Sequence, residues 1–208
     1  MQLRIQLGLA TLAFATVALA QNPITADSPF QVKYASNLNI GDSVFNITNS
    51  GASGGNICVS VYTFSPDEQE VSCCACLVTP NALVSLSAKT DLVSNTLTPA
   101  VPTSIVVKLV ATIGGATVGS CNAATAGAGT ATISPGLAAW GTTLHGIVAA
   151  PGVEESAVGL TETRFTPATL SATELTRITS LCGFIQSNGS GFGICRSCRL
   201  GGLGAVAQ

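Results

Sequence analysis

The eight cysteines are the residues whose type and spacing most clearly suggest chemistry. An even number of cysteines in a chain that reaches an oxidising compartment predicts disulfide bonds. Cys73 and Cys74 are adjacent and would project to opposite faces of a strand, so we expect them to bond different partners. A bond from Cys182 to one of the two terminal cysteines would fix the tail to the helix, but the sequence does not rank these cysteines against Cys121 as its partner. Cys121 is expected to anchor the connection around it. The disulfide candidates are Cys58, Cys73, Cys74, Cys76, Cys121, Cys182, Cys195 and Cys198.

The same cysteines allow two other chemistries. Cys74-x-Cys76 and Cys195-x-x-Cys198 together could supply four thiolates to zinc, although an oxidising compartment favours disulfides over such a site. Cys195 and Cys198 also have the spacing of an oxidoreductase dithiol, and Arg196 between them could favour a thiolate. That motif lies near the end of the chain rather than between a strand and the start of a helix. We therefore expect no metal and no cofactor, and covalent haem is excluded because Arg199 stands where its motif needs histidine.

A second set of residues has the order of a hydrolase. Gly51-Ala52-Ser53-Gly54-Gly55 matches the G-x-S-x-G nucleophile motif, and Asp67 or Asp91 and then His145 follow it along the chain. The motif requires a strand, a sharp turn and a helix, whereas here a further strand follows the glycines. The preferred interpretation is a flexible hairpin loop, with His145 as a hydrogen-bonded structural residue, and no catalytic residue is expected.

Other carboxylates show no spacing that indicates a site. Asp67, Glu68 and Glu70 cluster beside a proline turn, and Glu154-Glu155 lie in a Gly/Pro loop, where solvated surface is the ordinary interpretation. A pair of glycosidase carboxylates would have to face one cleft, which sequence spacing does not establish.

The composition excludes several classes of protein. The 208 residues are 47% hydrophobic and only 9% charged, with a net charge of −2 and no Lys/Arg cluster. Nucleic-acid binding needs a basic surface, and disorder needs low hydrophobicity with high charge, so neither is expected. Weak charge repulsion permits self-association.

The first 20 residues have the pattern of a secretory signal peptide. Arg4 precedes an apolar stretch from Leu7 to Ala20, which ends in the small-x-small sequence Ala18-Leu19-Ala20. We expect a mature chain that begins near Gln21 and is secreted, periplasmic or at the cell surface. No later apolar run is long enough to predict a transmembrane helix.

The region 21–112 is expected to form the core of an antiparallel, immunoglobulin-like β-sandwich. Alternating or continuous apolar segments predict strands at 43–48, 57–64, 71–78, 83–88 and 105–111, with prolines and turn residues between them. In the first of these, Phe45 and Ile47 should share one face. The segment 57–64 is apolar on both faces and should be a central strand that is covered on both sides.

The second half of the chain is expected to pack on the same domain. Residues 113–152 are rich in Gly, Ala and Thr and predict a connection in which 139–148, with Trp140 and His145, could return as a strand. Residues 153–198 should contain one helix, 172–187, and a cysteine-rich closure, followed by a flexible tail at 199–208. Ser171 to Glu174 have the form of a capping box, and Leu181 is expected to widen the apolar face of the helix.

Several motifs together resemble a group of uncharacterised secreted bacterial proteins. They are Gly41-Asp42-Ser43 with Asn46-Ile47-Thr48-Asn49, Asn56 to Val59 through Tyr62, Phe64 to Gln69, Ser72 to Cys76, Leu97-Thr98-Pro99, Val101 to Ser104, Trp140 to His145, and Gly191 to Cys198. The resemblance covers most of the mature chain except its Gly/Ala-rich middle. It implies an exported bacterial setting and brings no activity with it, and in that setting the sequons at Asn46 and Asn188 are interpreted as chance.

The expected function is therefore that of an exported, non-catalytic structural, surface or filament component, or of a binding module. Self-association or a surface or matrix partner is expected, and the ligand is unknown. The alternatives are a secreted hydrolase that uses His145 with Ser53 or a carboxylate, and an extracytoplasmic thiol-disulfide protein that uses Cys195 and Cys198.

Overall fold

A computed structural model describes residues 28–93, 100–127, 131–146, 158–188 and 193–199. The expected signal peptide, the glutamates Glu154 and Glu155, and the tail after Arg199 lie outside the described residues.

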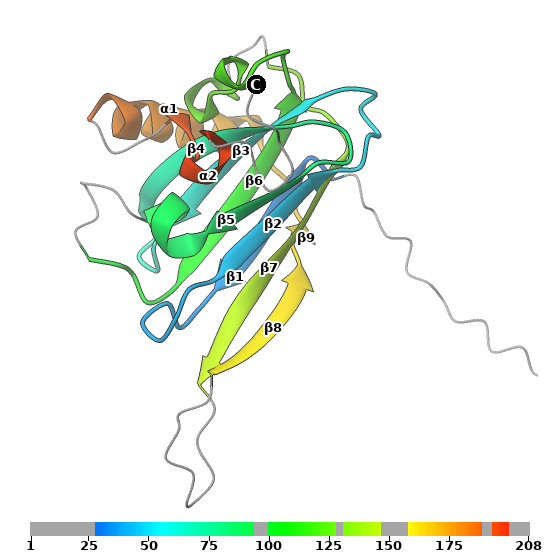
Figure 1. Ribbon diagram of the computed structural model, residues 1–208. Helices are drawn as coiled ribbons and strands as arrows, with labels where there is room; N and C mark the ends of the chain where they lie inside the picture. The colour runs from blue at the N-terminus through cyan, green and yellow to red at the C-terminus, as the bar shows by residue number, and fades with distance from the viewer. Residues whose placement is uncertain (1–27, 94–99, 128–130, 147–157, 189–192, 200–208) are drawn as a thin grey trace, which may run out of the picture.

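The described chain forms two β-sheets (Figure 1). The six-stranded sheet has the order β10 (Gly193–Ile194), β4 (Glu70–Val78), β3 (Ile57–Phe64), β6 (Ile105–Ile113), β1 (Phe30–Ala35) and β9 (Thr166–Pro167). The four-stranded sheet has the order β5 (Leu83–Ser87), β2 (Val44–Asn49), β7 (Leu137–Gly146) and β8 (Val158–Arg164). All pairs are antiparallel except β10 on β4, which is parallel. The expectation of a mainly β, antiparallel and disulfide-bonded protein is confirmed.

The main core lies between the two sheets and follows the alternation of the strands. Phe45 and Ile47 of β2 face inward and are fully buried, together with Val59 of β3 and Leu109 of β6. The strand β3 is buried on both faces, as its continuous apolar sequence predicted, because α1 (Ala172–Ser187) covers its other side. The layers are therefore a helix, the six-stranded sheet and the four-stranded sheet.

The helix α1 begins and ends where its sequence predicted. The Ser171 hydroxyl accepts a hydrogen bond from the Glu174 N–H (3.0 Å), which satisfies one free donor of the first turn. Ile178, Cys182 and Ile185 are buried against the sheet. The prediction for Leu181 is wrong, because this side chain is exposed, as is that of Phe184. The helix contacts the sheet through a narrow row of buried side chains, and Leu181 lies at the edge of that row.

Two connections differ from the sequence interpretation. The segment 50–56 is not a hairpin loop, since β2 and β3 belong to different sheets and this turn carries the chain from one to the other. After β6, two short 3₁₀ turns, Val118–Ser120 and Ala123–Thr125, precede β7, which lies in the interior of the four-stranded sheet between β2 and β8. The strand β8 was not predicted. A π-helical turn, Ala88–Val93, follows β5, and the short helix α2 (Arg196–Arg199) follows β10.

A close approach inside the sandwich makes one glycine of β7 necessary. A Cβ on Gly141 would lie 2.7 Å from Cδ1 of Phe45 and 3.1 Å from Cε of Lys33. We expect Gly141→Ala to lower the free energy of unfolding by about 1–3 kcal/mol through overpacking, as measured by urea denaturation. The matched control is Gly55→Ala, where an added Cβ meets no atom within 4 Å. Equal stabilities of the two variants would contradict the packing argument.

Candidate functional site

Four disulfides join the eight cysteines, and none of the cysteines in the described residues is free. The pairs are Cys58–Cys121, Cys73–Cys182, Cys74–Cys195 and Cys76–Cys198. Cys73 and Cys74 bond different partners on opposite faces of β4, as predicted, and Cys121 anchors the 3₁₀ turns to β3. Neither of the partners considered for Cys182, a terminal cysteine or Cys121, is the one that it bonds. The helix places Cys182 over the outer face of β4, where Cys73 lies, whereas both terminal cysteines reach the inner face.

The cysteines considered for zinc or redox chemistry do come together, as parts of two disulfides. The sulfur atoms of Cys76, Cys195 and Cys198 lie within 4.8 Å of one another and are buried. Cys195 and Cys198 bond different strand positions rather than each other. A disulfide sulfur lacks the thiolate charge that both zinc binding and nucleophilic attack require. The arrangement is a double link between α2 and β4.

The hydrolase candidates are not brought together. Ser53 lies in the loop after Asn49, which pairs with Leu137 at the start of β7, and the Ser53 hydroxyl donates to the carbonyl of Gly55 (2.8 Å). His145 lies eight residues farther along β7, which is roughly 27 Å at the usual strand rise. The imidazole Nε2 is 2.7 Å from the Thr161 hydroxyl on β8, which agrees with a hydrogen-bonded structural role.

The two aspartates of the hydrolase order have local roles. The Asp67 carboxylate accepts a hydrogen bond from the Ser65 hydroxyl in the same turn. The buried Asp91 carboxylate accepts from the backbone N–H of Ser87 (2.9 Å), and from the N–H (2.7 Å) and hydroxyl (2.8 Å) of Ser197. Asp91 therefore fixes α2 beside the π-helical turn, and its carboxylate bonds Ser87 and Ser197 rather than a hydrolase candidate.

A groove of about 770 Å³ lies between α1 and one end of the six-stranded sheet. Its volume is within the range of small-molecule sites. Apolar side chains from three strands and the helix form much of its lining, together with hydroxyl groups and a few charged groups. The apolar members are Tyr34, Phe64, Ile105, Val106, Ile178 and Leu181, and the charged members are Glu68, Lys108, Glu174 and Arg177.

Lys108 of β6 is held in the groove by two contacts. Its Nζ lies 2.6 Å from a carboxylate oxygen of Glu174 on α1 and 4.7 Å from the ring centre of Phe64. The ion pair is partly exposed and contributes little stability, and it links α1 to β6 at this end of the sheet. Arg177, one turn farther along α1, is exposed and has no carboxylate partner among the described residues. It is the cation of the groove that remains free to meet an anion.

Glu70 lies next to this charged pair and has an unusual environment. Both carboxyl oxygens are buried and have no hydrogen-bond partner within the described part of the chain. One of them lies within 4.8 Å of the sulfur atoms of Cys73 and Cys182. Burial raises the pKa of Glu70 to about 8, and the nearby Lys108 charge offsets only part of that effect. Glu70 is therefore a neutral carboxylic acid at neutral pH.

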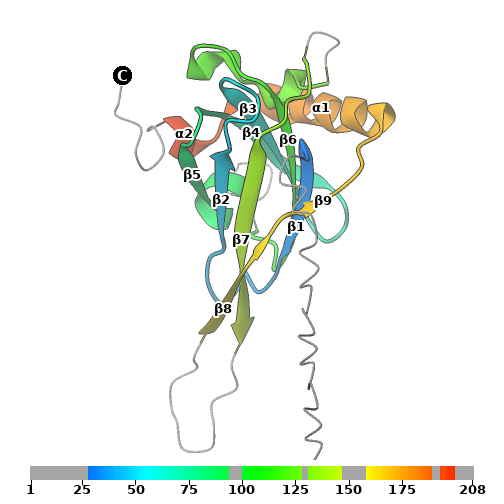
Figure 2. The same ribbon diagram turned by 90° about the vertical axis from the view of Figure 1, so that its right-hand side faces the viewer.

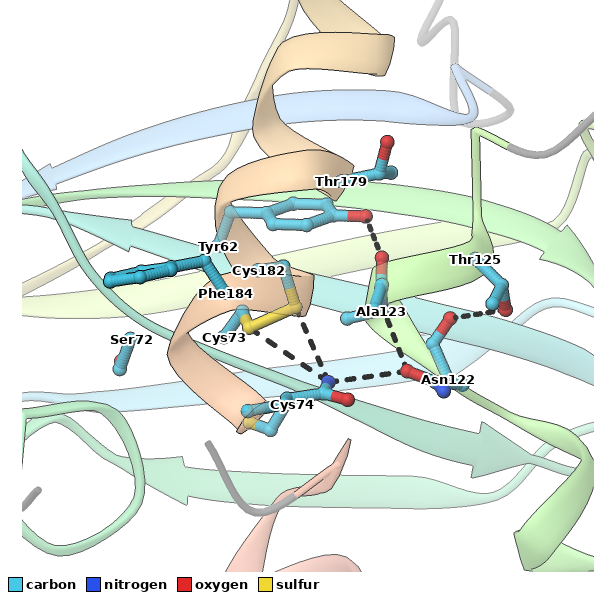
Figure 3. The surroundings of a disulfide bond; sticks show 12 residues. Tyr62, Ser72, Cys73, Cys74, Asn122, Ala123, Thr125, Thr179, Cys182 and Phe184 are labelled. Carbon is cyan, nitrogen blue, oxygen red and sulfur yellow. Dashed lines mark hydrogen bonds between the residues drawn. A yellow bond between two sulfur atoms is a disulfide. The ribbon is translucent and has the colours of Figure 1, made fainter. Parts of the chain in front are cut away.

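The surroundings of the Cys73–Cys182 bond, where α1 contacts the sheet, are closely packed (Figure 3). Tyr62 of β3 lies between α1 and the second 3₁₀ turn, and its hydroxyl donates to the carbonyl of Ala123 (2.6 Å). Burial raises the pKa of Tyr62 above its usual range, so the phenol stays protonated. The Gln186 amide donates to the Asn122 carboxamide oxygen (3.2 Å) beside the Cys73–Cys182 bond. One wall of the groove is thus fixed by a disulfide and by hydrogen bonds.

The groove was not predicted from the sequence. Its lining comes from β1, β3, β6 and α1, which are distant in sequence, so no local pattern indicates it.

A scan against protein-family models gives no match, and searches of curated proteins and of solved structures match none either. None of the helices in the described ranges has the length and apolar character needed to cross a bilayer.

The raised pKa of Glu70 predicts a pH dependence of stability. The unfolded chain releases this proton near pH 4.5 and the folded chain near pH 8, so the folded state binds more protons between these values. Stability should fall as pH rises from about 4.5 to 8. Glu70→Gln should flatten this slope and raise the unfolding midpoint at pH 8, as measured by urea denaturation across the range. Glu68→Gln, which changes an exposed carboxylate, is the control and should keep the native slope.

The disulfide pairing predicts a specific set of linked peptides. Unfolding in the presence of an alkylating agent and without a reductant should leave the cysteines unlabelled. Proteolytic digestion should then release the peptide of Cys182 still linked by a disulfide to the peptide of Cys73. The double variant Cys73→Ala/Cys182→Ala should lose about 2–5 kcal/mol of stability, because the loop it leaves open is long. A peptide that joins Cys182 to Cys195 or Cys198 would contradict the structure.

Proposed function

We propose that this chain is an exported, non-catalytic binding protein of an oxidising compartment, and that the groove beside α1 takes a small amphipathic molecule with an acidic group. Four disulfides support the compartment, since such bonds persist where thiols are oxidised. The secretory signal and the immunoglobulin-like strand order stay predictions. The support for the latter is two facing antiparallel sheets with connections that cross between them.

The observation that carries the proposed binding role is the free Arg177 beside an apolar groove. Phe64, Ile178 and Leu181 offer apolar contact, and the Lys108–Glu174 pair is already satisfied. An anion in the groove would therefore meet Arg177, and a charge-assisted hydrogen bond in a partly desolvated groove favours that pairing. A neutral apolar ligand would leave the guanidinium without a partner.

The test uses 8-anilinonaphthalene-1-sulfonate, an apolar anion whose fluorescence reports binding. Arg177→Gln should weaken its binding by about tenfold, since a hydrogen bond to a charged group contributes about 1.5–3 kcal/mol. Arg164→Gln, on the opposite sheet, removes the same charge and should leave the affinity at the native value. Equal affinities of the native protein and both variants would show that the dye binds elsewhere, and the groove would lose its assignment.

A further inference from the structure

The strand β8 is the free edge of the four-stranded sheet. It pairs with β7 on one side, and within the described ranges no strand lies on its other side. All of its residues are exposed except Gly159, which is partly buried. The β7–β8 hairpin extends beyond the rest of the two sheets (Figure 2).

The direction of its backbone groups follows from one hydrogen bond. Phe165, just after β8, donates its N–H to the carbonyl of Ala139 on β7 (2.9 Å). Hydrogen-bonded residues alternate along an antiparallel pair, so the odd-numbered residues of β8 direct their backbone N–H and C=O groups toward β7. The even-numbered residues therefore direct their N–H and C=O groups away from the sheet. These outward residues are Val158, Leu160, Glu162 and Arg164.

The free edge has few of the devices that usually prevent pairing. It has no proline and no lysine, and its register with β7 is continuous. Leu160 is 64% exposed and Val158 is 45% exposed on the same face. The charges of Glu162 and Arg164 cancel, so two such strands would not repel each other.

The other edges of the described sheets are short or covered. On β5, the outward N–H of Ser87 donates to Asp91, and α2 contacts the strand. The strands β9 and β10 have two residues each, and β9 ends in Pro167. Among the edge strands of the two described sheets, β8 is thus the longest.

We propose that two copies of this chain pair through antiparallel β8 strands about a two-fold axis at Thr161. This register places Val158 opposite Arg164 of the second copy and Leu160 opposite its Glu162. It uses the whole strand, and the four outward residues of each copy would form about eight backbone hydrogen bonds in all. The two Leu160 side chains would lie diagonally across the axis, within reach of each other.

A second copy suits this edge because the strand is complementary to itself in length, backbone pattern and net charge. The symmetry also decides the size of the assembly. A two-fold contact uses the same edge of both copies, so pairing closes at a dimer with one continuous eight-stranded sheet, formed from two four-stranded sheets. A filament would need a second open edge.

Sedimentation velocity of the exported protein over a range of concentrations tests the assembly. We expect a reversible dimer for the native chain and a monomer for Leu160→Glu, because a glutamate at position 160 would lie opposite Glu162 of the second copy and like charges directly across a strand pair repel. The unfolding midpoints of the two chains should be equal at a concentration at which both are monomeric. Leu83→Glu is the control, because Leu83 is 43% exposed on β5 of the same sheet, and it should remain dimeric. A native chain that stays monomeric, or a dimer that survives Leu160→Glu, would overturn the proposal.

Cysteine cross-linking tests the register. Thr161→Cys should form an intermolecular disulfide under mild oxidation, because residue 161 faces itself across the axis at a non-hydrogen-bonded pair, where Cα atoms lie about 4.5 Å apart. Thr163→Cys should not, since residue 163 would face Gly159 of the second copy. Equal cross-linking of the two variants would overturn the proposed pairing.

Discussion

The strand β4 is held from both of its faces, and the arrangement of the other elements depends on this. Because side chains alternate along a strand, Cys73 projects toward α1 while Cys74 and Cys76 project toward α2. One strand therefore fixes two helices on opposite sides of the sheet. Each of the three bonds closes a loop of more than 100 residues. In the chain-entropy model a single loop of that length corresponds to about 4.7 kcal/mol.

Few charged groups support this frame, and their placement separates structural from functional candidates. Asp91 accepts three hydrogen bonds and joins α2 to the turn after β5. Lys108 joins α1 to the sheet through Glu174. Glu70 has no such partner among the described residues and remains neutral at neutral pH. Arg177 is the cation of the groove lining that has no ion-pair partner among the described residues, and for this reason the groove rather than His145 is the candidate site.

Sequence patterns predicted those elements whose burial requires a clear pattern of apolar residues, either on one face or continuous along the strand. The strand β3 and the helix α1 have strong apolar patterns because each is buried in a defined way, and their bounds follow. The strand β8 has no such pattern, since it is exposed on both faces and is held by pairing with β7. The partner of Cys182 was missed because spacing does not tell which face of β4 lies under the helix. The groove needs four elements at once, so no local pattern encodes it.

The order of the cysteines along the chain has a consequence for how the protein acquires its bonds. Cys73, Cys74 and Cys76 appear early during synthesis, whereas their partners Cys182, Cys195 and Cys198 lie at the far end of the described residues. Because the N-terminus emerges first, the three thiols of β4 are present together before their native partners have been made. An oxidant that reaches the chain in that interval can join two of these thiols in a non-native disulfide. A thiolate of a later cysteine must then attack that disulfide and release one of its sulfurs as a thiol before the native pairs can form.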